Sequence, residues 1–172
     1  MTPETASRLI ELNLRFYQEF GKEFSATRRR LQPGVQRLLP QLYPVEALLD
    51  LGCGNGELAR ALARGGFAGR YFGLDFSRPL LRETEGLPPN FSFLEASLTT
   101  SDWDQVVPLT GFSIVTAFAV LHHIPSQAFR LMLLRKVWAL LVPAGLFIHS
   151  EWQFLSSEKW RQTEFNPGAM PA

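Results

Sequence analysis

The sequence contains a single cysteine, has almost no net charge and lacks any long apolar run. Cys53 cannot form an internal disulfide, which argues against a disulfide-stabilised secreted domain. The formal charge of +1 favours no particular class of partner. No apolar run approaches the roughly 20 residues that cross a bilayer, and no charged-then-apolar leader opens the chain. We therefore expect a cytoplasmic protein without a membrane segment.

The composition is that of an ordinary soluble domain. Apolar residues make up 46% of the chain and charged residues 19%, which sets it apart from disordered and coiled-coil proteins. The length of 172 residues suits one hydrophobic core. We expect one globular unit, with a helical arm or lid over residues 1–44 and a ligand-binding domain over residues 45–172. Seven Lys and Arg against four Glu make residues 1–40 modestly basic.

Helix-like and strand-like segments alternate along the chain. An amphipathic helix is expected in residues 1–40, interrupted by Pro33 and Pro40. Its apolar stripe consists of Leu9, Leu12, Phe16 and Phe20. Further helices are expected over 56–66, after Ser77 and over 126–141, and strands over 45–51, 70–75, 90–96, 112–118 and 143–152. This alternation predicts an α/β fold with a parallel, doubly wound sheet, which binds ligands beyond the carboxyl ends of its strands.

Two local details complete this prediction. Gly65 and Gly66 are expected to end the helix 56–66 with a left-handed cap, and Asn55 to cap its beginning. In the helix 126–141, the methionine and tryptophan side chains, Met132 and Trp138, are expected in the core rather than at a ligand.

The most informative stretch is LLDLGCGNGELAR, residues 48–60, in which an apolar strand ends at an acid and a glycine-rich turn. Gly52, Gly54 and Gly56 allow positive φ angles and leave the backbone open to a ligand. A dinucleotide fingerprint has its third glycine where this chain has Glu57. Asp50 would repel a diphosphate and attract a cationic group. An NAD-dependent oxidoreductase is therefore disfavoured.

These residues resemble motif I of the class I S-adenosylmethionine-dependent methyltransferases, which have a Rossmann-like fold. The resemblance implies the strand order 3-2-1-4-5, S-adenosylmethionine as cofactor, and a second acid, Asp75, that binds the ribose hydroxyls. It implies that Ser97 binds the adenine amine, that Phe76 flanks the purine and that Phe118 approaches the methionine part. The complete cofactor set is Asp50, Gly52, Gly54, Asn55, Gly56, Asp75, Phe76, Ala96, Ser97 and Phe118.

The substrate side resembles one branch of this family, the tRNA wobble-uridine carboxymethyl methyltransferases. The run FSATR, residues 24–28, and the later AVLHHI, residues 119–124, carry this likeness. It implies methyl-ester formation on a carboxylate, with Arg28 near the pocket. Eukaryotic members of this branch have a small zinc-binding partner protein, which nothing in this sequence establishes.

His122 and His123 are the other candidate residues on the substrate side, as a general base or as part of its lining. No metal site is expected, because adjacent histidines in one connection point in different directions.

The end of the fold and the identity of the acceptor leave alternatives open. The family normally continues with a helix and two further strands, so strands six and seven are expected to be missing and the fifth strand to be an apolar edge. That edge would suit a protein partner or self-association. The acceptor is alternatively a small molecule or a protein, and the chain is alternatively a non-catalytic interaction module.

Overall fold

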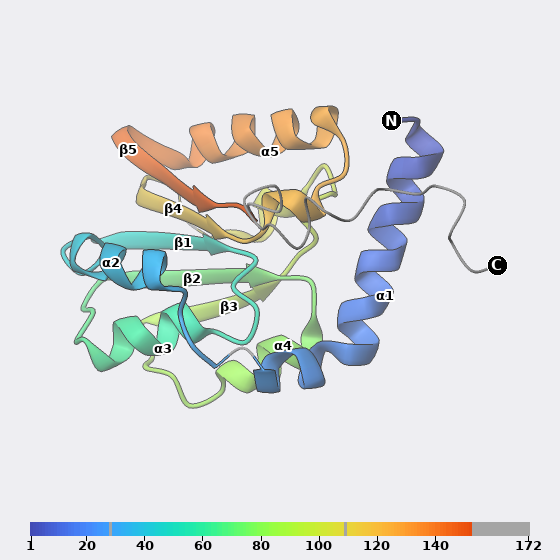
Figure 1. Ribbon diagram of the computed structural model, residues 1–172. Helices are drawn as coiled ribbons and strands as arrows, with labels where there is room; N and C mark the ends of the chain where they lie inside the picture. Colours follow the sequence, from blue (N-terminus) through green and yellow to red (C-terminus); the bar gives the residue numbers. More distant parts are fainter. Residues whose placement is uncertain (28, 109, 153–172) are drawn as a thin grey trace.

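The structure is a computed structural model that describes residues 1–27, 29–108 and 110–152. Its centre is a parallel sheet of five strands in the order β3-β2-β1-β4-β5 (Figure 1). The strands are β1 (Ala47–Leu51), β2 (Arg70–Asp75), β3 (Phe91–Glu95), β4 (Phe112–Phe118) and β5 (Leu141–Ser150). The predicted fold class and strand order are confirmed, with the strand that precedes the glycine loop in the middle.

Helices surround this sheet on three sides. Helix α5 (Gln127–Leu140) covers one face, and α2 (Pro33–Leu42) and α3 (Glu57–Arg64) cover the other (Figure 1). The long helix α1 (Pro3–Thr27) runs past the carboxyl ends of the strands, and α4 (Arg78–Leu81) follows β2. Three short 3-10 turns, η1 (Arg82–Thr84), η2 (Trp103–Val106) and η3 (Leu121–His123), complete the described elements.

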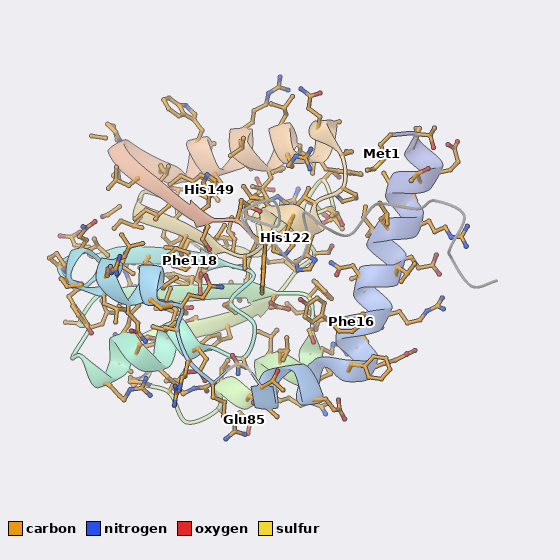
Figure 2. All side chains as sticks on the ribbon, viewed as in Figure 1. Met1, Phe16, Glu85, Phe118, His122 and His149 are labelled. Carbon is orange, nitrogen blue, oxygen red and sulfur yellow. The ribbon has the colours of Figure 1, made fainter. Side chains whose placement is uncertain are left out.

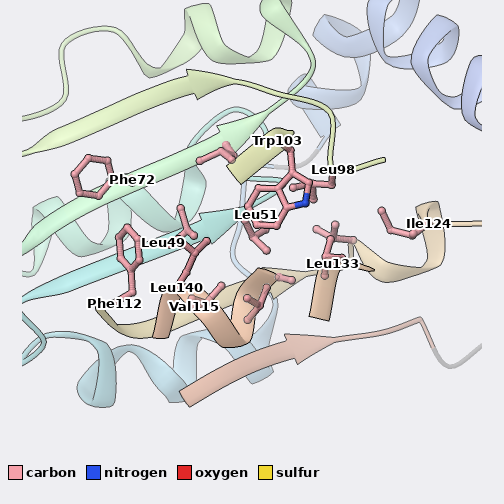
Figure 3. Packing of buried hydrophobic residues seen from close by; sticks show 14 of the residues in the cluster. Leu49, Leu51, Phe72, Leu98, Trp103, Phe112, Val115, Ile124, Leu133 and Leu140 are labelled. Atoms are coloured by element: carbon pink, nitrogen blue, oxygen red, sulfur yellow. The ribbon is translucent and has the colours of Figure 1, made fainter. Parts of the chain in front are cut away.

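Alternate side chains of β1 enter two hydrophobic clusters, as the two-residue period of a strand requires. Leu49 packs in the cluster that contains Leu133 of α5 and Trp103 of η2 (Figure 3). Leu48 packs in the cluster on the opposite face, with Val35 of α2 and other residues of α2 and α3. Because β1 is buried on both faces, the loop that follows it has a rigid base.

The carboxyl-terminal ends of α3 and α2 test the predictions made for the glycine cap and for Pro40. Gly66 has a φ of 77°, and the Phe67 N–H donates to Leu62 O, so the predicted left-handed cap is confirmed. The prediction that Pro40 interrupts a helix is wrong, since α2 continues to Leu42. Pro40 is tolerated because it lies in the last turn of α2. It removes a single backbone N–H donor there, and the helix ends before a further turn would be disturbed.

Two apolar side-chain sets lie differently from what the pattern indicated. The stripe Leu9, Leu12, Phe16 and Phe20 of α1 is exposed, and the helix instead buries the face that carries Ala6 and Ser25. The expectation that Trp138 belongs to the core is wrong, because 82% of its surface is exposed. Leu133 and Val137 fill the inner face of α5. Trp138, the neighbour of Val137, therefore faces outward.

Within the described residues, no helix has the length and apolar character needed to cross a membrane. The expectations for the segment after Trp152, including the missing strands, concern residues outside the described part. Here β5 forms one edge of the sheet.

Candidate functional site

A pocket lies where the strands end and α1 passes over them. Its walls come from the loop after β1, the ends of β2, β3 and β4, and the inner face of α1. The structure brings nearly all predicted cofactor residues to this pocket: Asp50, Gly52, Gly54, Asn55, Asp75, Phe76, Ala96, Ser97 and Phe118. Gly56 is the exception, because it shapes the start of α3 and does not line the pocket.

The glycine loop adopts a backbone that side chains would obstruct. Gly52 has a φ of 70°, and a Cβ atom there would lie 2.5 Å from Val120 Cγ2. Gly54 has a φ of 54°, and a Cβ there would meet nothing within 4 Å, so its backbone faces open space. Cys53, between them, is buried, and burial raises the pKa of its thiol. The peptide groups at Gly54 are therefore open to the pocket.

Asp50 lies at the base of this loop with only 4% of its surface exposed. Its two carboxylate oxygens accept hydrogen bonds from Tyr71 Oη at 2.6 Å and from Thr116 Oγ1 at 2.7 Å. Burial raises the pKa of Asp50 to about 6, although both hydroxyls oppose the shift. The sequence reasoning missed Tyr71 and Thr116. The sheet register, which pairs Asp50 with Thr116, is the signal that identifies the second of them.

Asp75, at the end of β2, is the second buried acid of the pocket. Its Oδ2 accepts from Gly54 N at 2.9 Å, and its Oδ1 accepts from Ser77 N at 2.8 Å. Burial raises the pKa of Asp75, and the backbone donors partly oppose this shift. The carboxylate, which also lines the pocket, thus ties the glycine loop to β2. The tie to Gly54 is a role that the sequence reasoning did not include.

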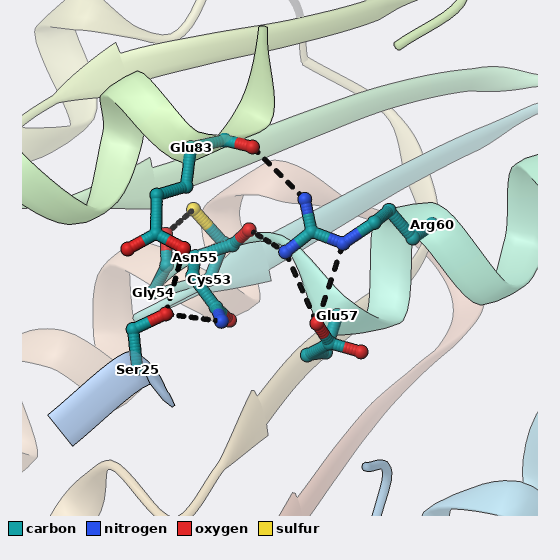
Figure 4. Close-up of polar contacts among 7 residues, drawn as sticks. All are labelled: Ser25, Cys53, Gly54, Asn55, Glu57, Arg60 and Glu83. Carbon is teal, nitrogen blue, oxygen red and sulfur yellow. Dashed lines mark hydrogen bonds and ion pairs between the residues drawn. The ribbon is translucent and has the colours of Figure 1, made fainter. Parts of the chain in front are cut away.

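Asn55 connects the glycine loop to α1 instead of capping α3. The N-cap of α3 is Gly56, so the cap prediction for Asn55 is wrong. Its amide nitrogen donates to Ser25 Oγ at 2.8 Å, and the Ser25 hydroxyl donates to Glu83 Oε2 at 2.8 Å (Figure 4). Arg60 completes the network by donating to Glu83 O at 2.9 Å. The predicted FSATR element is therefore joined to the glycine loop through its serine.

A tyrosine of α1 and a histidine of η3 form a pair in the pocket lining. Tyr17 Oη and His123 Nε2 are 3.2 Å apart, and the Tyr17 ring also packs edge-on against Phe76. Burial, and after it the neighbouring His122, lowers the pKa of His123 to about 4, so its imidazole is neutral at pH 7.

The two predicted histidines have separate surroundings. His123 lines the pocket, whereas His122 Nδ1 lies 3.3 Å from Glu151 Oε2 and outside the pocket lining. Figure 2 labels His122, which belongs to the η3 turn that follows β4. Across the described ranges, no three His, Cys, Asp or Glu side chains gather as a metal site requires.

Two further observations concern the substrate side of the pocket. Arg28, the predicted substrate-side arginine, lies outside the described residues, but Arg30 lines the pocket. Ala119, which also lines it, has a φ of 57°, a left-handed conformation that is costly for a residue with a Cβ. Its N–H donates to Ser150 O at 3.0 Å, so β5 holds this strained residue at the pocket wall.

The donor set matches the chemical groups of S-adenosylmethionine. A buried carboxylate such as Asp50 suits a cationic ammonium group, and a carboxylate with free lone pairs such as Asp75 suits a vicinal diol. The open backbone at Gly54 lines the same pocket as these two acids. Phe76 and Leu98 supply apolar walls on the β2–β3 side, where a flat base would pack.

Comparison with known proteins supports this match. The family model described as a methyltransferase domain matches residues 23–172. The chain is 34% identical over 119 residues to a trans-aconitate 2-methyltransferase of Pseudomonas paraeruginosa, covering 69% of this chain and 40% of that protein. It is 25% identical over 166 residues to the tRNA (carboxymethyluridine(34)-5-O)-methyltransferase of Arabidopsis thaliana, covering 96% of this chain and 38% of that protein. The chain spans between 34% and 60% of the length of the curated relatives it matches first.

Solved structures share the fold. CalS10, an amino pentose methyltransferase of Micromonospora echinaspora solved with S-adenosylmethionine bound, is 20% identical with a TM-score of 0.60, over 78% of this chain and 57% of that one. A Haloferax volcanii methyltransferase, solved in complex with the Trm112 methyltransferase activator, is 21% identical with a TM-score of 0.65, over 84% and 64%. With its pocket of two buried acids and an open glycine loop, this chain belongs to the methyltransferase domain family, and its cofactor is S-adenosylmethionine.

Proposed function

We propose that this protein methylates a carboxylate, and that the acceptor is the carboxymethyl group of a modified wobble uridine in tRNA. The observation that carries the proposal is the charge of the pocket. Its three acids come from the carboxyl-terminal parts of two strands, Asp50 of β1 and Asp75 of β2, and from the start of α3, Glu57. Among the described residues, the wall formed by α1 and the α1–α2 connection has no acid and one cation, Arg30. This wall suits an anionic acceptor.

The chemistry of a carboxylate acceptor agrees with the neutral side chains on that wall. A carboxylate with a solution pKa of about 4 is already ionised at pH 7, so the protein has no proton to remove. A carboxylate oxygen forms the bond to the methyl carbon, and the electron pair of the breaking carbon–sulfur bond stays on sulfur. Tyr17, His123 and Leu14 then need only to align the acceptor and exclude water.

Two relatives support an acidic acceptor by the names they carry. One methylates trans-aconitate, which is a tricarboxylate, and the other methylates tRNA carboxymethyluridine. The likeness to the second extends over 96% of this chain, and the FSATR element contributes Ser25 to the network at the glycine loop. We propose that Arg28, which follows in this element, lies near the acceptor.

A second candidate function is methyl transfer to a hydroxyl group of a small molecule or protein. The Tyr17–His123 pair favours it, because both side chains line the pocket and the neutral His123 imidazole can accept a hydrogen bond from an acceptor hydroxyl. Substitution of His123 by Gln separates the two candidates. A carboxylate acceptor keeps its kcat within a few-fold, whereas a hydroxyl acceptor loses about 100-fold.

We also propose a role for the amino-terminal residues, a location for the protein and a contact surface on the sheet edge. Residues 1–44 act as an arm over the cofactor, the protein acts in the cytoplasm, and the β5 edge with the outer face of α5 is a contact surface for protein. Leu146 on β5 and Leu134 and Trp138 on α5 are exposed there, which supports this contact. The alternative of a non-catalytic interaction module predicts such contact without methyl transfer.

Calorimetry with S-adenosylhomocysteine and a transfer assay test the proposal. The Asp75→Ala variant should bind S-adenosylhomocysteine at least tenfold more weakly, whereas Asp102→Ala, which removes an exposed carboxylate, should bind normally. Methyl groups from labelled S-adenosylmethionine should enter an anticodon hairpin with 5-carboxymethyluridine and not the same hairpin with uridine. Failure of the folded wild-type protein to bind S-adenosylhomocysteine contradicts the cofactor site. Binding without transfer to the first hairpin contradicts the acceptor.

A further inference from the structure

A second hollow lies on the surface beside the cofactor pocket, between α2, α3 and the connection from α1 to α2. Its cationic side chains are Arg29 and Arg30 from the connection and Arg64 from the last turn of α3. Arg30, Leu31 and Glu57 line both this hollow and the cofactor pocket, so the two adjoin. We call the hollow the arginine groove and define it by Arg29, Arg30 and Arg64.

The positive charge of the arginine groove is not neutralised by nearby acids. None of its three arginines forms an ion pair with another described residue. Glu57 is the acid that lines the groove, and its carboxylate already pairs with Arg60 at 3.1 Å. Three guanidinium groups from two separate segments thus line one hollow without an ion-pair partner in the described part of the chain. Such an arrangement attracts an anion with more than one charged group.

An aromatic side chain forms part of the groove. Tyr43 follows α2 and lies against the backbone of Gly65, where a Cβ atom would be 2.0 Å from the tyrosine oxygen. A larger residue at position 65 would push Tyr43 away, so this glycine sets the position of the ring. Single-stranded nucleic acids bind surfaces that combine arginines for the phosphates with aromatic rings for the bases.

We propose that the arginine groove binds the phosphates of a single-stranded stretch of the RNA acceptor, next to the nucleotide that enters the cofactor pocket. This inference rests on the proposed tRNA function and adds its contact surface. Arg30 stands at the junction, where the RNA chain passes from groove to pocket. Arg64 joins the site from a helix that the FSATR resemblance does not include.

The salt dependence of RNA binding tests the groove. The Arg29→Gln/Arg64→Gln variant keeps Arg30, which also lines the cofactor pocket. The matched control is Arg70→Gln/Arg135→Gln, which removes two exposed arginines from β2 and α5 with the same change in charge. Binding of the 5-carboxymethyluridine hairpin is measured between 50 and 200 mM salt. Over this range the loss of phosphate contacts dominates the change in affinity, which amounts to roughly a factor of ten or more.

We expect the groove variant to reduce the slope of log affinity against log salt by about 1.4, at about 0.7 per lost phosphate contact, and the control to leave it unchanged. Equal slopes for the two variants would overturn the groove. Calorimetry with S-adenosylhomocysteine and transfer by the wild-type protein report separately on the proposed function. Normal cofactor binding and transfer with equal slopes therefore reject the groove alone, whereas wild-type protein that binds cofactor but no RNA rejects both the groove and the tRNA acceptor.

Discussion

At the residue scale, the raised pKa of Asp50 predicts that cofactor affinity depends on pH. With its pKa of about 6, this carboxyl group is ionised in roughly one molecule in ten at pH 5 and nine in ten at pH 7. The ionised form is the one that attracts an ammonium group. We therefore predict that the affinity for S-adenosylhomocysteine rises about tenfold from pH 5 to pH 7, as measured by calorimetry.

The Asp50→Asn variant is the control for this prediction. Its affinity should be lower at pH 7 and nearly independent of pH, since its amide does not titrate. An affinity of the wild-type protein that stays constant over this range would show that Asp50 does not contact the ammonium group.

Asp50 and His123 affect stability against pH in opposite directions. The pKa of Asp50 is raised in the folded protein, so its contribution is present at low pH and lost as the pH rises through about 6. The pKa of His123 is lowered to about 4, so its contribution is present above about 6.5 and lost as the pH falls toward 4. Their effects partly cancel between pH 4 and pH 6.

Variants separate the two contributions. The Asp50→Asn protein should lose stability more steeply than the wild type when the pH falls from 6 to 4, because the effect of His123 is then unopposed. The His123→Gln protein should instead gain stability over the same range. Urea unfolding at several pH values measures both, and parallel pH profiles for all three proteins would contradict the assignment.

At the scale of elements, the start of β5 contains a strained residue. Ala144 has a φ of 64°, where the register of β4 and β5 shifts between Phe112 and Ile114. A left-handed conformation costs a residue with a Cβ about 1–2 kcal/mol, and glycine avoids this cost. Glycine also makes the unfolded chain more flexible, which lowers the stability of the folded protein by about 0.5–1 kcal/mol. We predict that Ala144→Gly raises the free energy of unfolding by about 0.5–1 kcal/mol.

A second alanine provides the control for Ala144. Ala139 lies on the exposed side of α5, and Ala139→Gly should lower the free energy of unfolding by about 1 kcal/mol, as glycine does within a helix. Urea unfolding distinguishes the opposite signs. A loss of stability in both variants would mean that the β5 turn is not strained.

The contact between α1 and the glycine loop depends on Ser25. Ser25→Ala removes the acceptor of the Asn55 amide and the donor to Glu83, which leaves the buried Asn55 amide without its acceptor on α1. We predict a loss of about 1–3 kcal/mol in the free energy of unfolding, together with weaker cofactor binding. The control, Ser101→Ala, changes an exposed serine and should alter neither. Unchanged cofactor affinity in the Ser25 variant would show that α1 does not support the loop.

Local sequence patterns predicted the elements that depend on them. The strands 70–75 and 112–118 and the glycine cap at Gly66 were predicted at their observed positions, because strand burial and positive φ leave direct traces in the sequence. The Ser25–Asn55 bond joins residues 30 positions apart, and no local pattern encodes it. Pro40 was misjudged because a proline in the last turn of a helix resembles one that ends it.

The cofactor side of the pocket could be predicted from the order of the strands. The substrate side, which α1 forms, could not be predicted from the sequence. The carboxyl ends of parallel strands meet at one edge, so Asp50, Asp75 and Ser97 had to converge once the strand order was known. Periodicity shows that α1 has an apolar stripe but not which face meets the sheet. The side with Tyr17 lines the pocket, and Phe16 lies on the exposed stripe.

At the scale of the whole molecule, one patch of exposed apolar side chains lies on α5. Trp138, Leu134 and Leu131 of α5 are exposed beside the β5 edge strand. Exposed apolar groups next to an open strand edge promote association between copies. We predict that the protein self-associates reversibly at high concentration and that Leu134→Lys/Trp138→Lys raises the dissociation constant at least tenfold, as measured by analytical ultracentrifugation.

Charge alone must be excluded as the cause of that change. The control, Gln127→Lys/Ala139→Lys, places the same charges on exposed positions of α5 that carry no large apolar side chain. It should leave self-association unchanged. A strictly monomeric wild-type protein would contradict the prediction.

The Ser25–Asn55 bond also couples two binding events. The bond joins α1 to the glycine loop, which we propose holds the cofactor. The free energy that an ordered α1 adds to cofactor binding therefore equals the free energy that the bound cofactor adds to the ordering of α1. The same reciprocity holds for an acceptor that contacts α1. The factor by which the bound acceptor raises the affinity for the methyl donor equals the factor by which the bound donor raises the affinity for the acceptor. One serine hydroxyl would thus make the two substrates cooperative.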